Sequence, residues 1–197
     1  MIRSLLLVAG PSGSGKSRLT RLAAADGRAV ALSLDDFYFD ADHPGLPRWG
    51  EIVDWDDPAT WDADGAVASL RELLETGRTR VPVYDISLSR RTGMHDLVMP
   101  EGDTVIVAEG IFAVDLIARC ERSGLPVTPI WIDRPRAVTF ALRLKRDLQA
   151  HRKPPLVSLR RGVALARHEP QLRAKAVANG FRPLGLDESV ATIQRLS

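Results

Sequence analysis

The stretch GPSGSGKS at residues 10–17 has glycines, a lysine and a serine at a spacing that suits phosphate binding. Gly10 and Gly15 permit backbone torsions that other residues resist, so successive amide N–H groups can point at one anion. An apolar run precedes this loop and a helical pattern follows it, and a helix N-terminus adds to the attraction for an anion. Lys16 is then expected to reach the β- and γ-phosphates, and the Ser17 hydroxyl to bind Mg²⁺. The loop residues expected to bind a nucleoside triphosphate are Gly10, Ser12, Gly13, Ser14, Gly15, Lys16 and Ser17.

Carboxylates follow two other predicted strands. Asp35 and Asp36 come after the run AVALSL, and Glu109 ends the run TVIVAE. Ligands of parallel sheets gather at the carboxyl edge, where a carboxylate can accept the proton of a hydroxyl that attacks the γ-phosphate. A capped turn explains the Asp pair equally well on spacing alone. Asp133 competes with Glu109 for the metal-side position, but we prefer Glu109 because helix capping explains Asp133 by itself.

A basic stretch, RPRAVTFALRLKRDLQAHRK, is a candidate for a lid over the transfer site. Arg143 and Arg146 are three residues apart and therefore share one face of a helix. Arginines that close over a moving phosphoryl group stabilise its charge and expel water. A solvated basic helix face is the alternative, and the phosphate loop favours the lid.

A phosphate loop does not by itself distinguish a small-molecule kinase from a GTPase or an ATP-driven motor. The chain lacks the Asn-Lys-x-Asp sequence that recognises guanine, and 197 residues are few for a motor. A kinase is therefore favoured. A non-catalytic ATP- or GTP-binding regulator stays open, and the carboxylates are what distinguish the two classes, because a binder does not need them.

Alternating strand and helix patterns predict an α/β fold: a P-loop three-layer sandwich with a central parallel sheet, a small inserted hairpin and a helical lid. The chain is long enough for one domain with a proper core, spanning residues 1–197. Two irregular segments, 35–57 and 80–100, depart from the alternation and are expected to bind the acceptor; the second has the pattern of a strand or hairpin. The lid is expected over 143–156. Strands are predicted at 4–10, 29–34, 104–110 and 126–133, and helices at 16–25, 57–77, 133–150 and 156–179.

Composition gives few further constraints. The chain is 45% hydrophobic and 26% charged, with a net charge of only +2, so neither a nucleic acid nor a membrane is predicted as a partner. No stretch approaches the roughly 18 apolar residues of a membrane span. The single cysteine, Cys120, fits a reducing cytoplasm, and the N-terminal apolar run is interpreted as a buried strand rather than a secretion signal.

The ordered motifs GPSGSGKS, SLDDFY, DWDDPATWD, PVYD and AEGIFA resemble those of the uridine kinase-like nucleoside kinases. The wider group includes nicotinamide riboside kinase, phosphoribulokinase and bacterial pantothenate kinase. The resemblance covers residues 3–155 and implies a kinase that uses ATP and Mg²⁺ on a small-molecule acceptor.

The resemblance also implies roles for single residues. Asp35 matches the base that deprotonates a ribose 5′-hydroxyl, and Asp56 matches the carboxylate that binds the sugar hydroxyls. Tyr84 matches the aromatic residue beside the base, with Tyr38 as a further wall, and Arg91 ends that motif. The remaining matches are Glu109 near Mg²⁺, Lys16 at the phosphates, and Arg143, Arg146 and Arg152 in the lid.

One position departs from the family pattern. Pyrimidine-specific kinases carry a base-reading histidine shortly after the YD pair, and Ser89 takes its place here. The sequence therefore predicts a cytoplasmic kinase of a primary hydroxyl, first of all a nucleoside 5′-OH. Nicotinamide riboside, pantothenate and other small alcohols stay open as acceptors, as do the choice between ATP and GTP and the oligomeric state.

Overall fold

The protein is described here by a computed structural model of residues 3–25, 27, 29–102, 104–149 and 155–196; the side chains of residues 146–149 and 155–166 lie outside this description. Its centre is a five-stranded parallel sheet in the order β2-β7-β1-β8-β9. The four strands predicted from apolar runs are confirmed, whereas β9 was not predicted. The strands are β1 (Arg3–Ala9), β2 (Ala29–Ser33), β7 (Thr104–Glu109), β8 (Val127–Ile132) and β9 (Arg182–Leu184).

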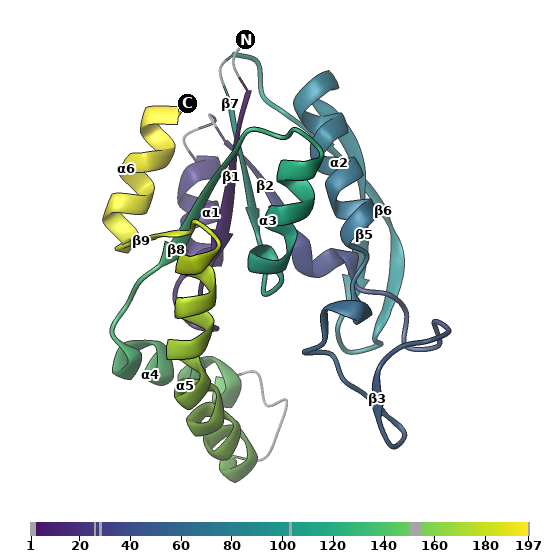
Figure 1. The fold of residues 1–197 in the computed structure, drawn as a ribbon, viewed down its shortest axis with the longest axis vertical. Coiled ribbons are helices and arrows are strands. Elements are labelled where there is room, and N and C mark those ends of the chain that lie inside the picture. Colours follow the sequence, from purple (N-terminus) through teal and green to yellow (C-terminus); the bar gives the residue numbers. More distant parts are fainter. Residues whose placement is uncertain (1–2, 26, 28, 103, 150–154, 197) are drawn as a thin grey trace.

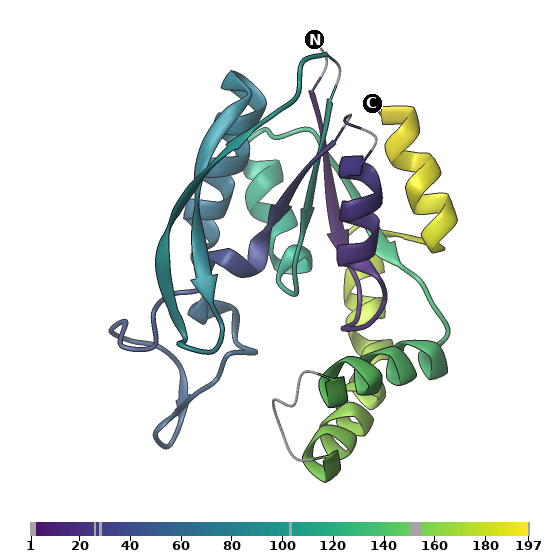
Figure 2. The ribbon, with the colours of Figure 1, turned by 180° about the vertical axis from the view of Figure 1, so that it is seen from behind.

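Helices cover both faces of the sheet, which confirms the predicted three-layer sandwich (Figures 1 and 2). Successive residues of a strand point to opposite faces, and β1 is apolar on both. Leu5 and Leu7 join one core cluster with Leu70 and Leu116, whereas Leu6 and Val8 join the other with Leu19 and Ile193. The first face is covered by α2 (Ala63–Thr76) and α3 (Ala113–Arg122), and the second by α1 (Lys16–Ala25) and α6 (Leu186–Leu196).

The helix predicted from Asp57 is wrong at its start. Asp57 caps only a 3₁₀ turn, η2 (Pro58–Thr60), and α2 begins at Ala63, where the Asp62 carboxylate accepts a hydrogen bond from Gly65 N. Between them Trp61 is extended, which buries its indole and lets Nε1 donate to Leu34 O. Burial of this large aromatic side chain outweighs one more helical turn.

The two irregular segments lie together beside α2. The 80–100 segment forms an antiparallel hairpin of β5 (Arg78–Asp85) and β6 (Arg90–Val98), as expected for a strand or hairpin. The hairpin contacts α2 and the 3₁₀ helix η1 (Leu34–Phe37). The short strands β3 (Arg48–Trp49) and β4 (Ile52–Val53) form a second, small hairpin between η1 and η2. The segments expected to bind the acceptor are thus grouped at one flank of the sheet (Figure 1).

Two long helices extend beyond the carboxyl edge of the sheet. They are α4 (Arg136–Gln149) and α5 (Pro155–Ala178), which contact each other and lie across the sheet edge from the β3 segment (Figure 1). Both helices were predicted, with α4 starting just after Pro135. In the described part of the chain, no helix combines the length and the apolar character that crossing a membrane requires.

Candidate functional site

The phosphate loop connects β1 to α1, and its glycines are required by its shape. Gly13 and Gly15 have φ values of +87° and +105°, which residues with a Cβ rarely adopt. A Cβ on Gly13 would lie 2.7 Å from Thr139 O of α4, and one on Gly10 would lie 2.8 Å from Ser14 Oγ. Ser14 is buried and its amide donates to Pro11 O, so it shapes the loop from within.

Lys16 and Ser17 carry the polar groups of the loop. Lys16 is buried, and its Nζ donates to Gly10 O at 2.9 Å and to Pro11 O at 3.3 Å. Ser17 Oγ donates to Glu109 Oε1 at 3.0 Å. This contact brings together the two groups predicted to bind Mg²⁺, an ion that prefers oxygen ligands. Within the described residues, no group of three or more His, Cys, Asp or Glu could hold a metal ion.

Asp35 lies at the same sheet edge as Glu109. Glu109 pairs in register with Val8 of β1 and Ser33 of β2, and Asp35 follows two residues after Ser33. Asp35 Oδ1 accepts a hydrogen bond from Ile111 N at 3.2 Å. Burial raises the pKa of Asp35 and of Glu109, and the nearby charge of Lys16 partly opposes both shifts. The charge of Lys16 therefore stabilises the ionised forms of both Asp35 and Glu109.

Gly110 is a functional position that the sequence reasoning missed. A Cβ there would lie 2.6 Å from Leu34 Cβ and 2.9 Å from Asp35 Oδ1. Only glycine leaves room for Asp35 at this place, and the AEG motif was the available signal. Asp133, the alternative to Glu109, has a different partner: its two oxygens accept from Arg173 Nε and Nη2 at 3.2 and 2.8 Å.

An aromatic cluster lies in the segments expected to bind the acceptor. The Tyr38 ring centroid is 5.5 Å from those of Trp55 and Tyr84 and 5.7 Å from that of Phe112. Tyr38 also donates from its hydroxyl to Trp55 O at 3.1 Å. Burial raises the pKa of Tyr38, and the charges of Asp35 and Asp56 raise it further. The structure thus brings together Tyr38 and Tyr84, two of the residues expected to contact the acceptor.

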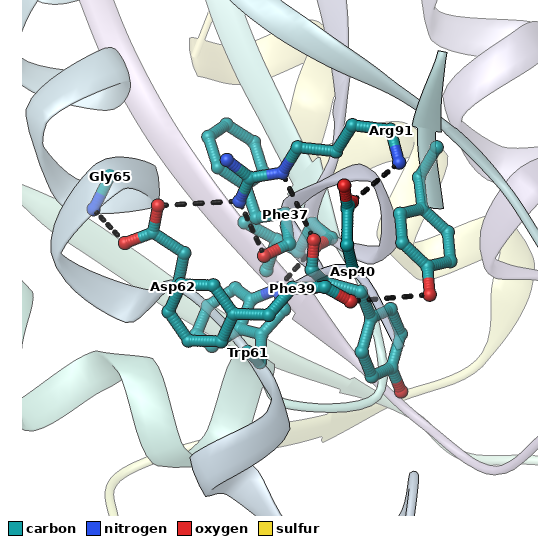
Figure 3. A network of polar contacts seen from close by, with 10 residues as sticks. Phe37, Phe39, Asp40, Trp61, Asp62, Gly65 and Arg91 are labelled. Carbon is teal, nitrogen blue, oxygen red and sulfur yellow. Dashed lines mark hydrogen bonds and ion pairs between the residues drawn. The ribbon is translucent and has the colours of Figure 1, made fainter. Parts of the chain in front are cut away.

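Arg91, which was expected to contact substrate, is bonded to the protein (Figure 3). Its Nε donates to Tyr38 O at 3.0 Å, and its Nη2 donates to Phe37 O at 3.1 Å and to Asp62 Oδ2 at 3.3 Å. Its backbone N–H donates to Asp40 Oδ1 at 2.7 Å. One side chain therefore ties the hairpin to the segment after η1 and to the start of α2.

Ser89 lies in the turn between β5 and β6. Its φ is +49°, its carbonyl accepts from Ala41 N, and its Oγ donates to Ile86 O at 3.5 Å. The residue expected at the place of a base-reading histidine is thus a small turn residue.

Of the three arginines expected in the lid, Arg143 is the one whose side chain lies within the described residues. Arg143 is buried, and its Nε and Nη2 donate to Ser12 O at 3.0 and 2.7 Å, so it supports the phosphate loop from α4. The Arg146 side chain and the whole of Arg152 lie outside the described residues.

A cavity of about 590 Å³ lies between the start of α4, α5 and the β9–α6 connection. Arg134, Glu169, Gly185 and Glu188 are among its lining residues. A Cβ on Gly15 would be 3.9 Å from Arg134 Nη1, so this cavity adjoins the phosphate loop. The sequence reasoning missed it because β9 and α6 were not predicted.

Comparisons with known proteins agree with this geometry. The model of the phosphoribulokinase / uridine kinase family matches residues 5–153. The chain is 30% identical over 147 residues to a uridine kinase of Staphylococcus haemolyticus, which covers 73% of this chain and 68% of that protein. It is 33% identical over 155 residues to inorganic pyrophosphatase TTM2 of Arabidopsis thaliana, covering 77% of this chain but only 21% of that much longer protein.

A solved structure from Silicibacter sp. TM1040, described as a candidate fructose transport system kinase, shares the fold with a TM-score of 0.59. It is 25% identical in sequence, and the match covers 93% of this chain and 87% of the other.

Proposed function

The chain belongs to the phosphoribulokinase / uridine kinase family, and on this premise we propose that it transfers the γ-phosphate of ATP to a primary hydroxyl of a small molecule, with a nucleoside 5′-OH as the acceptor. The observation that carries the proposal is the sheet edge where Ser17, Glu109 and Asp35 meet around Lys16. A protein that only binds nucleotide has no use for a base opposite its phosphate loop.

Each group has a defined task in this reaction. The loop amides and Lys16 hold the phosphates, and the N-terminus of α1 adds its positive end. Mg²⁺, held by Ser17 and Glu109, neutralises phosphate charge when bound. Asp35 accepts the proton of the attacking hydroxyl, since its carboxylate is held at the sheet edge by Ile111 N. Arg143 keeps the loop in shape through Ser12 O.

The acceptor is assigned to the segments 35–57 and 80–100. Asp56 binds the sugar hydroxyls, because a carboxylate accepts from two adjacent hydroxyls at once. Tyr38 and Tyr84 form the wall for the rest of the acceptor. The cavity beside Gly15 takes the nucleotide base. We place the reaction in the cytoplasm, where ATP is available and the buried free thiol of Cys120 stays reduced.

A neutral sugar is the second candidate acceptor. The similarity to the Silicibacter protein described as a candidate fructose transport system kinase, over 93% of this chain, favours it. Asp35 and Asp56 would serve the hydroxyls of a sugar in the same way.

The test is an ATP-consumption screen against nucleosides, nicotinamide riboside, pantothenate and simple sugars. Asp35→Asn is expected to lower kcat by at least about 1,000-fold while ATP affinity stays within about twofold. Asp64→Asn, on an exposed face of α2, is the matched control and is expected to retain full turnover. Turnover by Asp35→Asn at the level of the control would remove the base assignment.

A further inference from the structure

Carboxylates surround the aromatic cluster on the acceptor side. Asp36 Oδ1 accepts from Tyr84 N at 3.4 Å, and Asp40 Oδ1 accepts from the backbone N–H of Arg91. Besides burial, the charges of Asp35 and Asp56 both raise the pKa of the Tyr38 hydroxyl. These four aspartates all lie in the segment 35–57, which also contains Tyr38 of the proposed acceptor wall.

Two of the four arginines in the segments 35–57 and 80–100 donate to protein carbonyls. The Arg91 guanidinium donates to two carbonyls and to Asp62 (Figure 3). Arg48 donates to Glu51 O at 2.9 Å and to Ala41 O at 2.8 Å. Turning the Arg91 guanidinium toward a ligand would leave the part-buried carbonyls of Phe37 and Tyr38 without these donors.

Two other basic groups reach these carboxylates. Lys16 belongs to the phosphate loop and donates to its carbonyls. Burial raises the pKa of Asp36, and His95, on β6, partly opposes that shift. The segments 35–57 and 80–100 hold ten aspartate and glutamate residues against four arginines, so the net charge of the acceptor segments is negative.

We propose that the acceptor carries no negative charge: the site takes a neutral or cationic alcohol and rejects a carboxylated or phosphorylated one. This inference rests on the proposed function and narrows it. Of the acceptors that the motifs leave open, it retains nucleosides, nicotinamide riboside and neutral sugars and excludes pantothenate. Like charges about 6 Å apart at an effective dielectric constant of about 20 correspond to a discrimination of about 100-fold.

The experiment compares acceptors in pairs that differ by one anionic group: uridine with 5-carboxyuridine, panthenol with pantothenate, and ribulose with ribulose 5-phosphate. For each pair in which either member is turned over, kcat/KM is measured at 20 mM and 500 mM salt. We expect the uncharged member to be preferred by about 100-fold or more at low salt, with a smaller preference at high salt because salt screens the repulsion.

A variant separates charge from shape. Asp56→Asn keeps the size of the side chain, and it is expected to reduce the preference for the uncharged member several-fold, whatever it does to the absolute rate. Asp96→Asn, at an exposed position of β6, is the control and is expected to leave the preference unchanged.

The outcomes distinguish the two proposals. An equal or higher kcat/KM for the anionic member overturns this inference, while the loss of turnover in Asp35→Asn still supports the kinase. If no alcohol is phosphorylated at all, the proposed function and this inference fall together. A preference that neither salt nor Asp56→Asn alters would show that shape, and not charge, excludes the anion, and would also overturn the inference.

Discussion

Replacing Arg91 by lysine tests whether this residue positions the acceptor wall or touches the substrate. Lysine can keep the ion pair with Asp62, which is 3.3 Å long and about a third exposed. It cannot also donate to Phe37 O and Tyr38 O, which now accept from the guanidinium at 3.1 and 3.0 Å. Two lost hydrogen bonds at about 1 kcal/mol each lower the free energy of unfolding by about 2 kcal/mol.

Urea unfolding monitored by circular dichroism measures this loss. At an m-value of about 2–3 kcal/mol/M, the midpoint is expected to fall by roughly 0.7–1 M. The acceptor KM is expected to rise, because Tyr38 loses its anchor, while the ATP KM stays unchanged, because the phosphate loop is not part of this network. Arg80→Lys is the matched control on the same hairpin: its pair with Asp96 is 70% and 78% exposed and is expected to contribute less than about 0.5 kcal/mol.

The reasoning is refuted if Arg91→Lys unfolds at the wild-type midpoint while kcat/KM for the acceptor drops more than about tenfold. The guanidinium would then act on the substrate itself. Unchanged stability together with unchanged kinetics would show that the three bonds contribute nothing to either.

Three further predictions concern the phosphate loop, the base and the metal site. Gly13→Ala places a Cβ against the α4 backbone at a φ of +87° and is expected to weaken ATP binding at least about tenfold by calorimetry; wild-type affinity would contradict the fit. Asp36→Asn is expected to move the acid limb of the kcat/KM profile to lower pH. The pKa of Asp35 is raised chiefly by burial and additionally by the charge of Asp36, and Asp35 acts as a base in its ionised form. An acid limb that stays in place or moves to higher pH is the contrary result. Glu109→Gln is expected to raise the Mg²⁺ concentration for half-maximal rate about tenfold, as seen in a magnesium titration at fixed ATP, and an unaltered titration would remove Glu109 from the metal site.

The parts of the fold that follow from local pattern could be predicted from the sequence. The apolar runs of β1 and β7 are buried on both faces, and a strand of that kind needs no knowledge of its neighbours to be recognised. The strand, glycine loop and helix that hold Lys16 and Ser17 are equally local. They bring the predicted phosphate and metal groups together, and whether these residues catalyse the reaction stays a prediction.

The parts that depend on distant contacts could not be predicted. A capping Asp57 followed by Pro58 predicts a helix start, but these residues form only a 3₁₀ turn. Trp61 is extended instead, which buries its indole beside Leu34. Only the folded chain brings Phe37 O and Tyr38 O, which accept from the Arg91 guanidinium, to this side chain. Whether Arg91 also contacts the substrate stays a prediction. The three-residue strand β9 carries too little pattern to be seen without the sheet edge that it completes.

The contact of α4 with the phosphate loop has a thermodynamic consequence. Arg143 of α4 donates to Ser12 O, and the backbone of α4 at Thr139 lies so close to Gly13 that a Cβ there would be 2.7 Å from Thr139 O. A movement of α4 is therefore expected to move the phosphate loop with it. If ATP favours one tilt of the α4–α5 arm, that tilt must favour ATP by the same factor, because linkage is reciprocal. A molecule that binds α4 or α5 and favours one tilt of these helices therefore changes the affinity for ATP without entering the nucleotide site.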